Sequence, residues 1–97
     1  MENAMPPVHP GEILKDELIE LGLSANAFAK ALDVPTNRIT MILKGQRGIS
    51  ADTALRLSCY FGTSPQFWMN LQQSYDLKII QEKSGSEIKK TVKPRAA

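Results

Sequence analysis

Apolar residues recur every three or four positions along most of the chain, a spacing that places them on one face of a helix. Capping residues and glycines bound five such segments: the predicted N-caps include Ser24, Ser50 and Ser64, and the glycines predicted to end helices include Gly22 and Gly62. The pattern therefore predicts an all-α domain of five helices. The predicted helices cover residues 10–21, 25–32, 35–44, 51–61 and 65–82.

The segment from Ser24 to Gly45 contains the most informative part of this pattern, two short helices joined by a tight turn. Ser24 is a suitable N-cap, because its hydroxyl can accept a backbone N–H that has no helical partner. Asp33 lies where the chain must turn sharply, and Asp tolerates the left-handed conformation that such a turn requires. Pro35 suits the first position of the second helix, where its missing N–H costs nothing. This arrangement is typical of a helix-turn-helix, whose second helix enters the major groove of DNA.

The second helix of this pair separates an apolar face from a polar one. At about 100° per residue, Ile39, Ile42 and Leu43 fall together and are predicted to pack inward. Asn can pair bidentately with adenine and Arg with guanine, and the methyl groups of Thr and Met can contact the methyl group of thymine. The opposite side carries Asn37, Thr40, Met41 and Lys44, and Thr36 and Arg38 flank it near the N-terminal end of the helix.

The charge distribution distinguishes this interpretation from an ordinary helical hairpin with a solvated polar face. The net charge of +2 is too small to indicate nucleic acid by itself. However, no Asp or Glu occurs between Val34 and Ser50, whereas Arg38, Lys44 and Arg47 do. Lys44 and Arg47 bracket a loop and can hold phosphates on either side of the groove. The alternative is that they are two solvated charges.

The fifth predicted helix carries more apolar surface than a small core needs. Phe67, Leu71, Tyr75 and Ile79 recur at every fourth position, with Trp68 beside the first of them. Phe67 and Trp68 are expected to cover the core. The remaining surface either does the same or forms a dimer or partner interface, for which Leu71, Tyr75 and Ile79 are the predicted residues.

The length of 97 residues suits one domain with a modest core, flanked by two less regular ends. Residues 1–8 are rich in proline and are predicted to form a flexible N-terminus. Residues 9–82 form the predicted helix-turn-helix domain, which ends with the helix that carries the interface. The Ser-Gly-Ser sequence at 84–86 is predicted to break that helix. Residues 83–97 are then a flexible basic tail, which either adds attraction to nucleic acid or only increases solubility.

The chain offers little chemistry for catalysis or metal binding. Cys59 is the only cysteine, which excludes an internal disulfide, and its place in an apolar helix predicts a small buried hydrophobe. His9 is the only histidine, and a capping role is expected because no second ligand or nucleophile accompanies it. We therefore expect no enzyme, no metal and no cofactor. No stretch is apolar enough for a membrane span and no signal pattern occurs, so the expected location is the cytoplasm.

Two stretches carry a more specific signal, HPGEIL at residues 9–14 and VPTNRITMILKGQRGISADTALRLSCYFGTSPQFWMNLQQSYDL at residues 34–77. They resemble the HigA group of antitoxins, also called VapI-type or plasmid-maintenance antidote proteins. This group lies within the Xre/lambda-repressor-like helix-turn-helix superfamily. The resemblance covers roughly residues 8–80, and residues 49–77 are the part most specific to the group. Asp33 departs from many relatives, which have Gly there, and the turn is expected to tolerate it.

The resemblance implies a five-helix, lambda-repressor-like domain that forms a homodimer through its C-terminal helix and binds a palindromic operator on double-stranded DNA. It also implies a partner, a small ribonuclease toxin of the HigB/RelE-like type that is usually encoded beside the antitoxin. Such antitoxins block the toxin and repress their own operon. By position, the resemblance implies base reading by Thr36, Asn37, Arg38 and Thr40, and phosphate contacts by Ser24, Lys44 and Arg47.

Two other functions are compatible with the residues alone. One is a stand-alone Xre-type transcriptional regulator without a toxin, and the other is a helical protein-interaction module that has lost DNA binding. The prediction of DNA binding depends on both the residues and the resemblance. The prediction of toxin neutralisation depends on the resemblance only, because no segment contains a toxin-binding motif.

Overall fold

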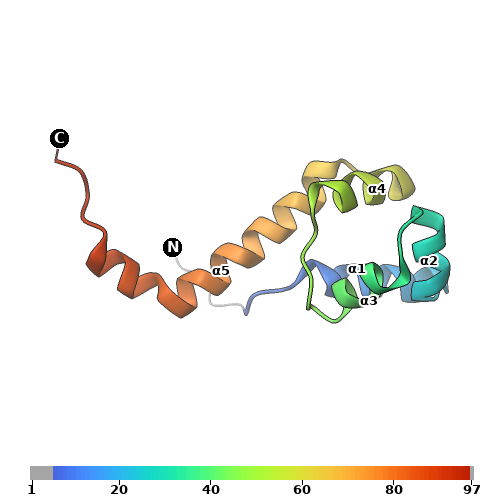
Figure 1. Ribbon diagram of the computed structural model, residues 1–97, viewed down its shortest axis with the longest axis horizontal. Coiled ribbons are helices and arrows are strands. Elements are labelled where there is room, and N and C mark those ends of the chain that lie inside the picture. Colours follow the sequence, from blue (N-terminus) through green and yellow to red (C-terminus); the bar gives the residue numbers. More distant parts are fainter. Residues whose placement is uncertain (1–5, 97) are drawn as a thin grey trace.

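The computed structural model describes residues 6–96, and in that range the chain forms helices joined by short turns, with no β-strand (Figure 1). The helices are α1 (Pro10–Leu21), α2 (Ala25–Leu32), α3 (Thr36–Leu43), α4 (Ala51–Phe61) and α5 (Pro65–Thr91). The prediction of an all-α, five-helix fold is therefore confirmed. None of these helices is long and apolar enough to cross a membrane.

Local capping chemistry determines where most of the helices begin and end. The hydroxyl groups of Ser24, Ser50 and Ser64 each accept the backbone N–H of the residue three positions later, as expected for N-caps. Gly22 and Gly62 end α1 and α4 in the left-handed conformation that glycine adopts without strain. These caps were predicted, and they explain why the helix boundaries agree with the sequence pattern to within a few residues in α1–α4.

The core lies where α1–α4 meet the first turns of α5. Phe28 of α2 and Trp68 of α5 are its largest side chains, and both are almost completely buried. Phe61, at the end of α4, lies between them, with ring centroids 5.8 Å from Phe28 and 5.9 Å from Trp68. Aromatic contacts at these separations add to the burial of apolar area. The first turns of α5 therefore belong to the same core as the helix-turn-helix.

Gln72 connects the loop between α3 and α4 to α5. Its Oε1 atom accepts the backbone N–H of Ile49 at 2.7 Å, and its Nε2 atom donates to Asp76 at 2.9 Å. Gly48 provides the space for this contact, because a Cβ at that position would lie 3.0 Å from the Gln72 amide. A buried amide with both ends hydrogen-bonded stabilises the loop at little desolvation cost.

Helix α5 is longer than the sequence predicted. It continues through Ser84 and Gly85 and ends at Thr91, so the predicted break at 84–86 and the non-helical tail from residue 83 are wrong. One Gly and two Ser residues cost only about 2 kcal/mol of helix propensity in total, and good helix formers flank them on both sides. The helix bends in its distal half, which contains these residues, and it projects away from α1–α4 (Figure 1).

Three other expectations concern side-chain burial and the N-terminus. Cys59 is exposed, so its predicted burial is wrong, because α4 directs Leu57 and Ser58 inward and Cys59 follows on the outer side. Phe67 is 44% exposed, and only Trp68 covers the core as expected. Of the predicted flexible N-terminus, residues 1–5 lie outside the described residues and residues 6–8 carry no helix.

Candidate nucleic-acid interface

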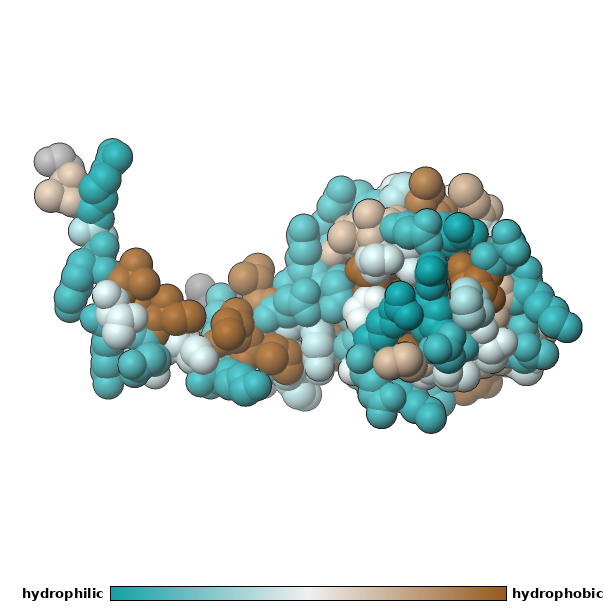
Figure 2. Space-filling model, in the orientation of Figure 1, coloured by the Kyte–Doolittle hydropathy of each residue, from teal (hydrophilic) through white to brown (hydrophobic). Residues whose placement is uncertain are grey.

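Helix α3 has the two faces that the sequence predicted. Ile39 and Ile42 are completely buried, whereas Asn37 is exposed and Thr40 and Met41 are partly exposed. The helix runs from Thr36 to Leu43, one residue shorter at each end than predicted. Its outward side is therefore polar and carries no carboxylate. Figure 2 shows hydrophilic residues across much of the body formed by α1–α4.

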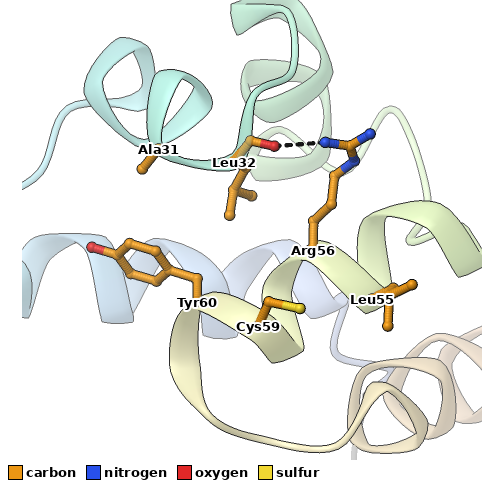
Figure 3. Close-up of a pocket in the computed structure, with 6 residues that line it drawn as sticks. All are labelled: Ala31, Leu32, Leu55, Arg56, Cys59 and Tyr60. Carbon is orange, nitrogen blue, oxygen red and sulfur yellow. Dashed lines mark hydrogen bonds between the residues drawn. The ribbon is translucent and has the colours of Figure 1, made fainter.

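The turn between α2 and α3 is tight and is supported from α4. Asp33 has φ 57° and ψ 50°, the left-handed conformation predicted for it. The backbone carbonyls of Leu32 and Asp33 accept hydrogen bonds from Nη1 of Arg56, at 2.9 and 3.3 Å. Figure 3 shows the first of these bonds, with Arg56 reaching from α4 to the end of α2. The angle at which α3 leaves the turn is thereby linked to α4.

The N-terminal end of α3 is linked to the start of α2. The Thr36 hydroxyl donates to Oδ1 of Asn26 at 2.8 Å, and the Thr40 hydroxyl donates to the backbone carbonyl of Asn37 at 3.2 Å. The two threonines predicted to read bases therefore already have partners within the chain. Sequence reasoning missed Asn26, because it is ten residues from Thr36 and their contact depends on how α2 and α3 pack.

Arg38 is only 23% exposed and forms an ion pair with Asp52, the first-turn acid of α4, at 2.7 Å. The same Oδ2 atom of Asp52 accepts Nε of Arg56 at 2.9 Å. These hydrogen bonds, first with Arg56 and then with Arg38, lower the pKa of Asp52, and the carboxylate in turn raises the pKa of Arg56. Sequence reasoning placed Arg38 beside the groove but did not find either of these partners.

The three residues predicted to contact phosphate differ in how free they are. The Ser24 oxygen accepts the N–H of Ala27 at 3.1 Å, so its lone pair is used by the cap while its O–H remains available to donate. Lys44 and Arg47 are exposed and have no hydrogen-bond or ion-pair partner among residues 6–96. Both lie in the segment that connects α3 to α4.

His9 lies where α1, α3 and α5 come together. Its Nδ1 atom accepts the N–H of Gly11 at 2.9 Å and caps α1, as predicted. Its ring meets the edge of Tyr75 with centroids 4.8 Å apart, beside a hollow of about 280 Å³ that Lys44 also lines. Burial lowers the pKa of His9, against the opposing attraction of Asp76 and Glu12.

The residues predicted for a dimer or partner interface are already partly covered by the chain itself. Leu71 packs against the core, Tyr75 contacts His9, and Ile79 is partly buried. Other apolar side chains of α5 are more exposed, and the sequence did not assign them to the interface. They are Phe67, Leu77, Ile80 and Ile88, followed by Val92 just after the helix. Figure 2 shows hydrophobic residues gathered along the projecting part of α5.

Comparisons with known proteins agree with this architecture. The helix-turn-helix family model matches residues 14–68. The chain is 55% identical to virulence-associated protein I of Dichelobacter nodosus, over 84% of this chain and 76% of that protein. It is 58% identical to the solved structure of an addiction module antidote protein of the HigA family from Coxiella burnetii, with a TM-score of 0.91 over 94% of this chain and 100% of that chain.

A further solved structure is that of the Pseudomonas aeruginosa antitoxin HigA with the higBA promoter. It is 48% identical, with a TM-score of 0.88 over 93% of this chain and 99% of that chain. The match of the family model, the identity to these relatives and their coverage of almost the whole fold all point to one group. The chain belongs to the helix-turn-helix family, as a member of its HigA group of antitoxins.

Proposed function

We propose that this protein is a DNA-binding antitoxin that acts as a homodimer in the cytoplasm, represses its own operon and neutralises a HigB/RelE-like ribonuclease toxin. The observation that carries DNA binding is the outward side of α3. It is polar and free of carboxylates, and it continues into two exposed cations without partners among the described residues, Lys44 and Arg47. The solved complex of the Pseudomonas aeruginosa relative with its promoter supports the same role here.

In this proposal α3 enters the major groove with its N-terminal end towards the base edges. Asn37 is the most exposed of the proposed base readers and has an amide that can pair bidentately with adenine. Thr36, Arg38 and Thr40 complete the set, with their hydroxyl, guanidinium and methyl groups. Phosphates are held by Lys44, Arg47 and the O–H of Ser24. These contacts position the helix on the DNA without reading its sequence.

A second copy of the chain is proposed to pair through α5, on the surface that includes Leu71, Tyr75 and Ile79. The exposed Leu77 and Ile80 extend that surface away from α1–α4. A two-fold dimer presents two copies of α3 and therefore matches a palindromic operator, with half-sites about 34–36 Å apart. The length of α5, which projects from the body, provides room for this contact away from the DNA-facing side (Figure 1).

DNA binding is tested by titrating the protein into a labelled duplex from immediately upstream of its own reading frame, at several salt concentrations. Neutralising several phosphates releases counterions, so the association constant is expected to fall steeply as salt increases. A duplex of the same composition with shuffled sequence is the control and is expected to bind at least 10³-fold more weakly. Equal, salt-independent binding to both duplexes would instead favour a protein-interaction module.

Two single variants separate base reading from phosphate binding. Asn37→Ala is expected to cost about 1–3 kcal/mol on the operator and to leave binding to the shuffled duplex unchanged. Lys44→Ala is expected to weaken binding to both duplexes alike and to lower the salt slope by about one. If the two variants behave in the same way, Asn37 does not read a base.

Toxin neutralisation is tested on the reading frame next to the gene. If that frame encodes a small basic protein, its induction alone is expected to arrest growth, and co-expression with this chain is expected to restore growth. A stable complex should co-purify. A neighbouring gene without any such effect, together with intact operator binding, would favour a stand-alone regulator.

A further inference from the structure

Arg38 differs from the other proposed base readers because its charge is shared with an acid from another helix. Its Nη1 atom donates to Asp52 at 2.7 Å, and only 23% of its side chain is exposed. An arginine has five N–H donors in a rigid, planar fork, so one ion pair leaves the remaining donors available. Among residues 6–96, the side chain of Arg38 makes no other hydrogen bond.

Asp52 is itself held in place. Its Oδ2 atom also accepts Nε of Arg56, four residues later on α4 and 2.9 Å away. Arg56 is in turn anchored at the end of α2 by the carbonyl of Leu32 (Figure 3) and by that of Asp33. A chain of hydrogen bonds therefore extends from the turn of the helix-turn-helix, through α4, to the guanidinium group on α3.

The charges along this series of hydrogen bonds favour the arrangement in which Asp52 lies between the two arginines. Two arginines converge on one carboxylate oxygen, and they would repel each other if that carboxylate were absent. The cluster keeps a net charge of +1, so the edge of α3 stays attractive to DNA while the position of the guanidinium is determined. A long side chain that is already ordered loses less conformational freedom when it contacts a base.

We propose that Asp52 is a positioning residue for base recognition, which holds Arg38 at the edge of α3 so that its unused N–H groups face the major groove. The inference depends on the proposed DNA-binding function and deepens it, since it names an acid on α4 as a determinant of sequence preference. Asp52 does not touch DNA in this proposal. Asp52 acts only through Arg38, and the hydrogen bond from Arg56 fixes the orientation of the Asp52 carboxylate.

The test compares Asp52→Asn with the wild type on the operator duplex and on a series of duplexes that each change one base pair. Asp16→Asn is the matched control, because it removes the same charge from the exposed side of α1. Exposed ion pairs contribute little to stability, so both variants are expected to fold, which their melting temperatures check. Arg38→Ala and the double variant with Asp52→Asn complete a cycle.

Asp52→Asn is expected to bind the operator about 5- to 100-fold more weakly than Asp16→Asn. It should lose discrimination at the same base pair as Arg38→Ala. The double variant should be no weaker than Arg38→Ala at that base pair. Asp52→Glu, which restores the charge on a longer side chain, is expected to recover part of the discrimination.

Three results would overturn the proposal. Tighter operator binding by Asp52→Asn than by Asp16→Asn would mean that Asp52 withholds Arg38 from DNA. A lower melting temperature with an unchanged base preference would mean that the ion pairs only join α3 to α4. If Arg38→Ala keeps the wild-type base preference, Arg38 does not read a base and Asp52 cannot act through it. Failure of the wild type to bind any duplex would refute the underlying function before any variant is examined.

Discussion

Helices α3 and α5 differ in the polarity of the surface that each exposes to solvent. The apolar residues Ile39 and Ile42 of α3 are completely buried, and the outward side of that helix is polar. In α5 only the first turns are part of the core, through Trp68, whereas Leu77 is 58% exposed and Ile80 is 43% exposed. One chain therefore completes the packing of α3 and leaves much of the apolar surface of α5 uncovered.

This difference indicates which kind of ligand each helix suits. The outward groups of α3 are donors, acceptors and cations, which water satisfies until the edges and phosphates of DNA replace it. The outward groups of α5 include exposed aliphatic side chains such as Leu77 and Ile80, which only another apolar surface covers favourably. DNA and a protein partner can thus occupy separate surfaces of the same small domain.

The largest expected effect tests where the core ends in α5. Trp68→Ala is expected to lower the free energy of unfolding by about 3–5 kcal/mol, because it empties the space beside Phe61. Phe67→Ala is the matched control on the neighbouring, 44% exposed aromatic residue, and it is expected to cost less than about 1.5 kcal/mol. Urea unfolding monitored by circular dichroism measures both. Equal losses would place Phe67 in the core as well.

The next effect tests the uncovered part of α5. A double substitution, Leu77→Ser with Ile80→Ser, is expected to weaken self-association by about 2–4 kcal/mol, since each burial of a Leu or Ile contributes about 1.5–3 kcal/mol. Sedimentation equilibrium gives the dimer dissociation constant, which should rise by about 30-fold or more. Ile19→Ser is the control, because Ile19 is 68% exposed on α1. An unchanged dissociation constant would exclude this surface from the dimer.

A smaller effect concerns His9, which contacts both the body and α5. Burial lowers the pKa of His9 below its ordinary value of about 6.5, so the folded chain binds fewer protons than the unfolded chain near and just below that pH. The free energy of unfolding is therefore expected to fall as the pH falls through 6.5 and towards the lower folded pKa. Burial is the main cause, and protonation also removes the cap that Nδ1 makes with Gly11, which contributes about 0.5–2 kcal/mol.

His9→Asn provides the control for this pH dependence, because Asn is a good N-cap that does not titrate. The difference in free energy of unfolding between the wild type and His9→Asn is expected to change between pH 8 and pH 5 and to be constant above pH 7.5. A constant difference over the whole range would show that His9 does not contribute to acid destabilisation.

The local features of this fold could be predicted from the sequence, and they were confirmed. The N-caps Ser24, Ser50 and Ser64 were predictable because each capping hydrogen bond joins residues only three positions apart. Asp33 takes the left-handed conformation because the turn leaves little choice. The distal half of α5 was mispredicted for a related reason. The Ser-Gly-Ser sequence has a low helix propensity, yet its strongly helical flanks outweigh it and the helix continues through it.

The contacts that join separate helices could not be predicted in the same way. Arg38 and Asp52 are 14 residues apart, and Thr36 and Asn26 are ten apart, so both pairs depend on how the helices pack. The polar face of α3 was predictable from its period, but the ion pair that holds one of its residues was not. The proposed contacts to bases, phosphates and a second copy remain predictions, and operator complexes would test them.

The smallest expected effect tests whether the helix-turn-helix depends on the side chain of Asp33 or only on its backbone. Asp33 has φ 57°, where glycine is free of strain, and the hydrogen bonds that Arg56 makes there go to carbonyl oxygens, so the Asp33 carboxylate adds only a weak attraction to Arg56. Asp33→Gly is therefore expected to raise the melting temperature by about 2–6 °C, the equivalent of roughly 0.5–1 kcal/mol, with no change in operator preference. Asp33→Ala is the opposing control, since it keeps the Cβ without a polar group and should lower stability. A change of base preference in Asp33→Gly would show that the Asp33 carboxylate, through Arg56, takes part in orienting α3. The surface of α3 would then differ from that of α5 also in depending on charges from residues outside the helix.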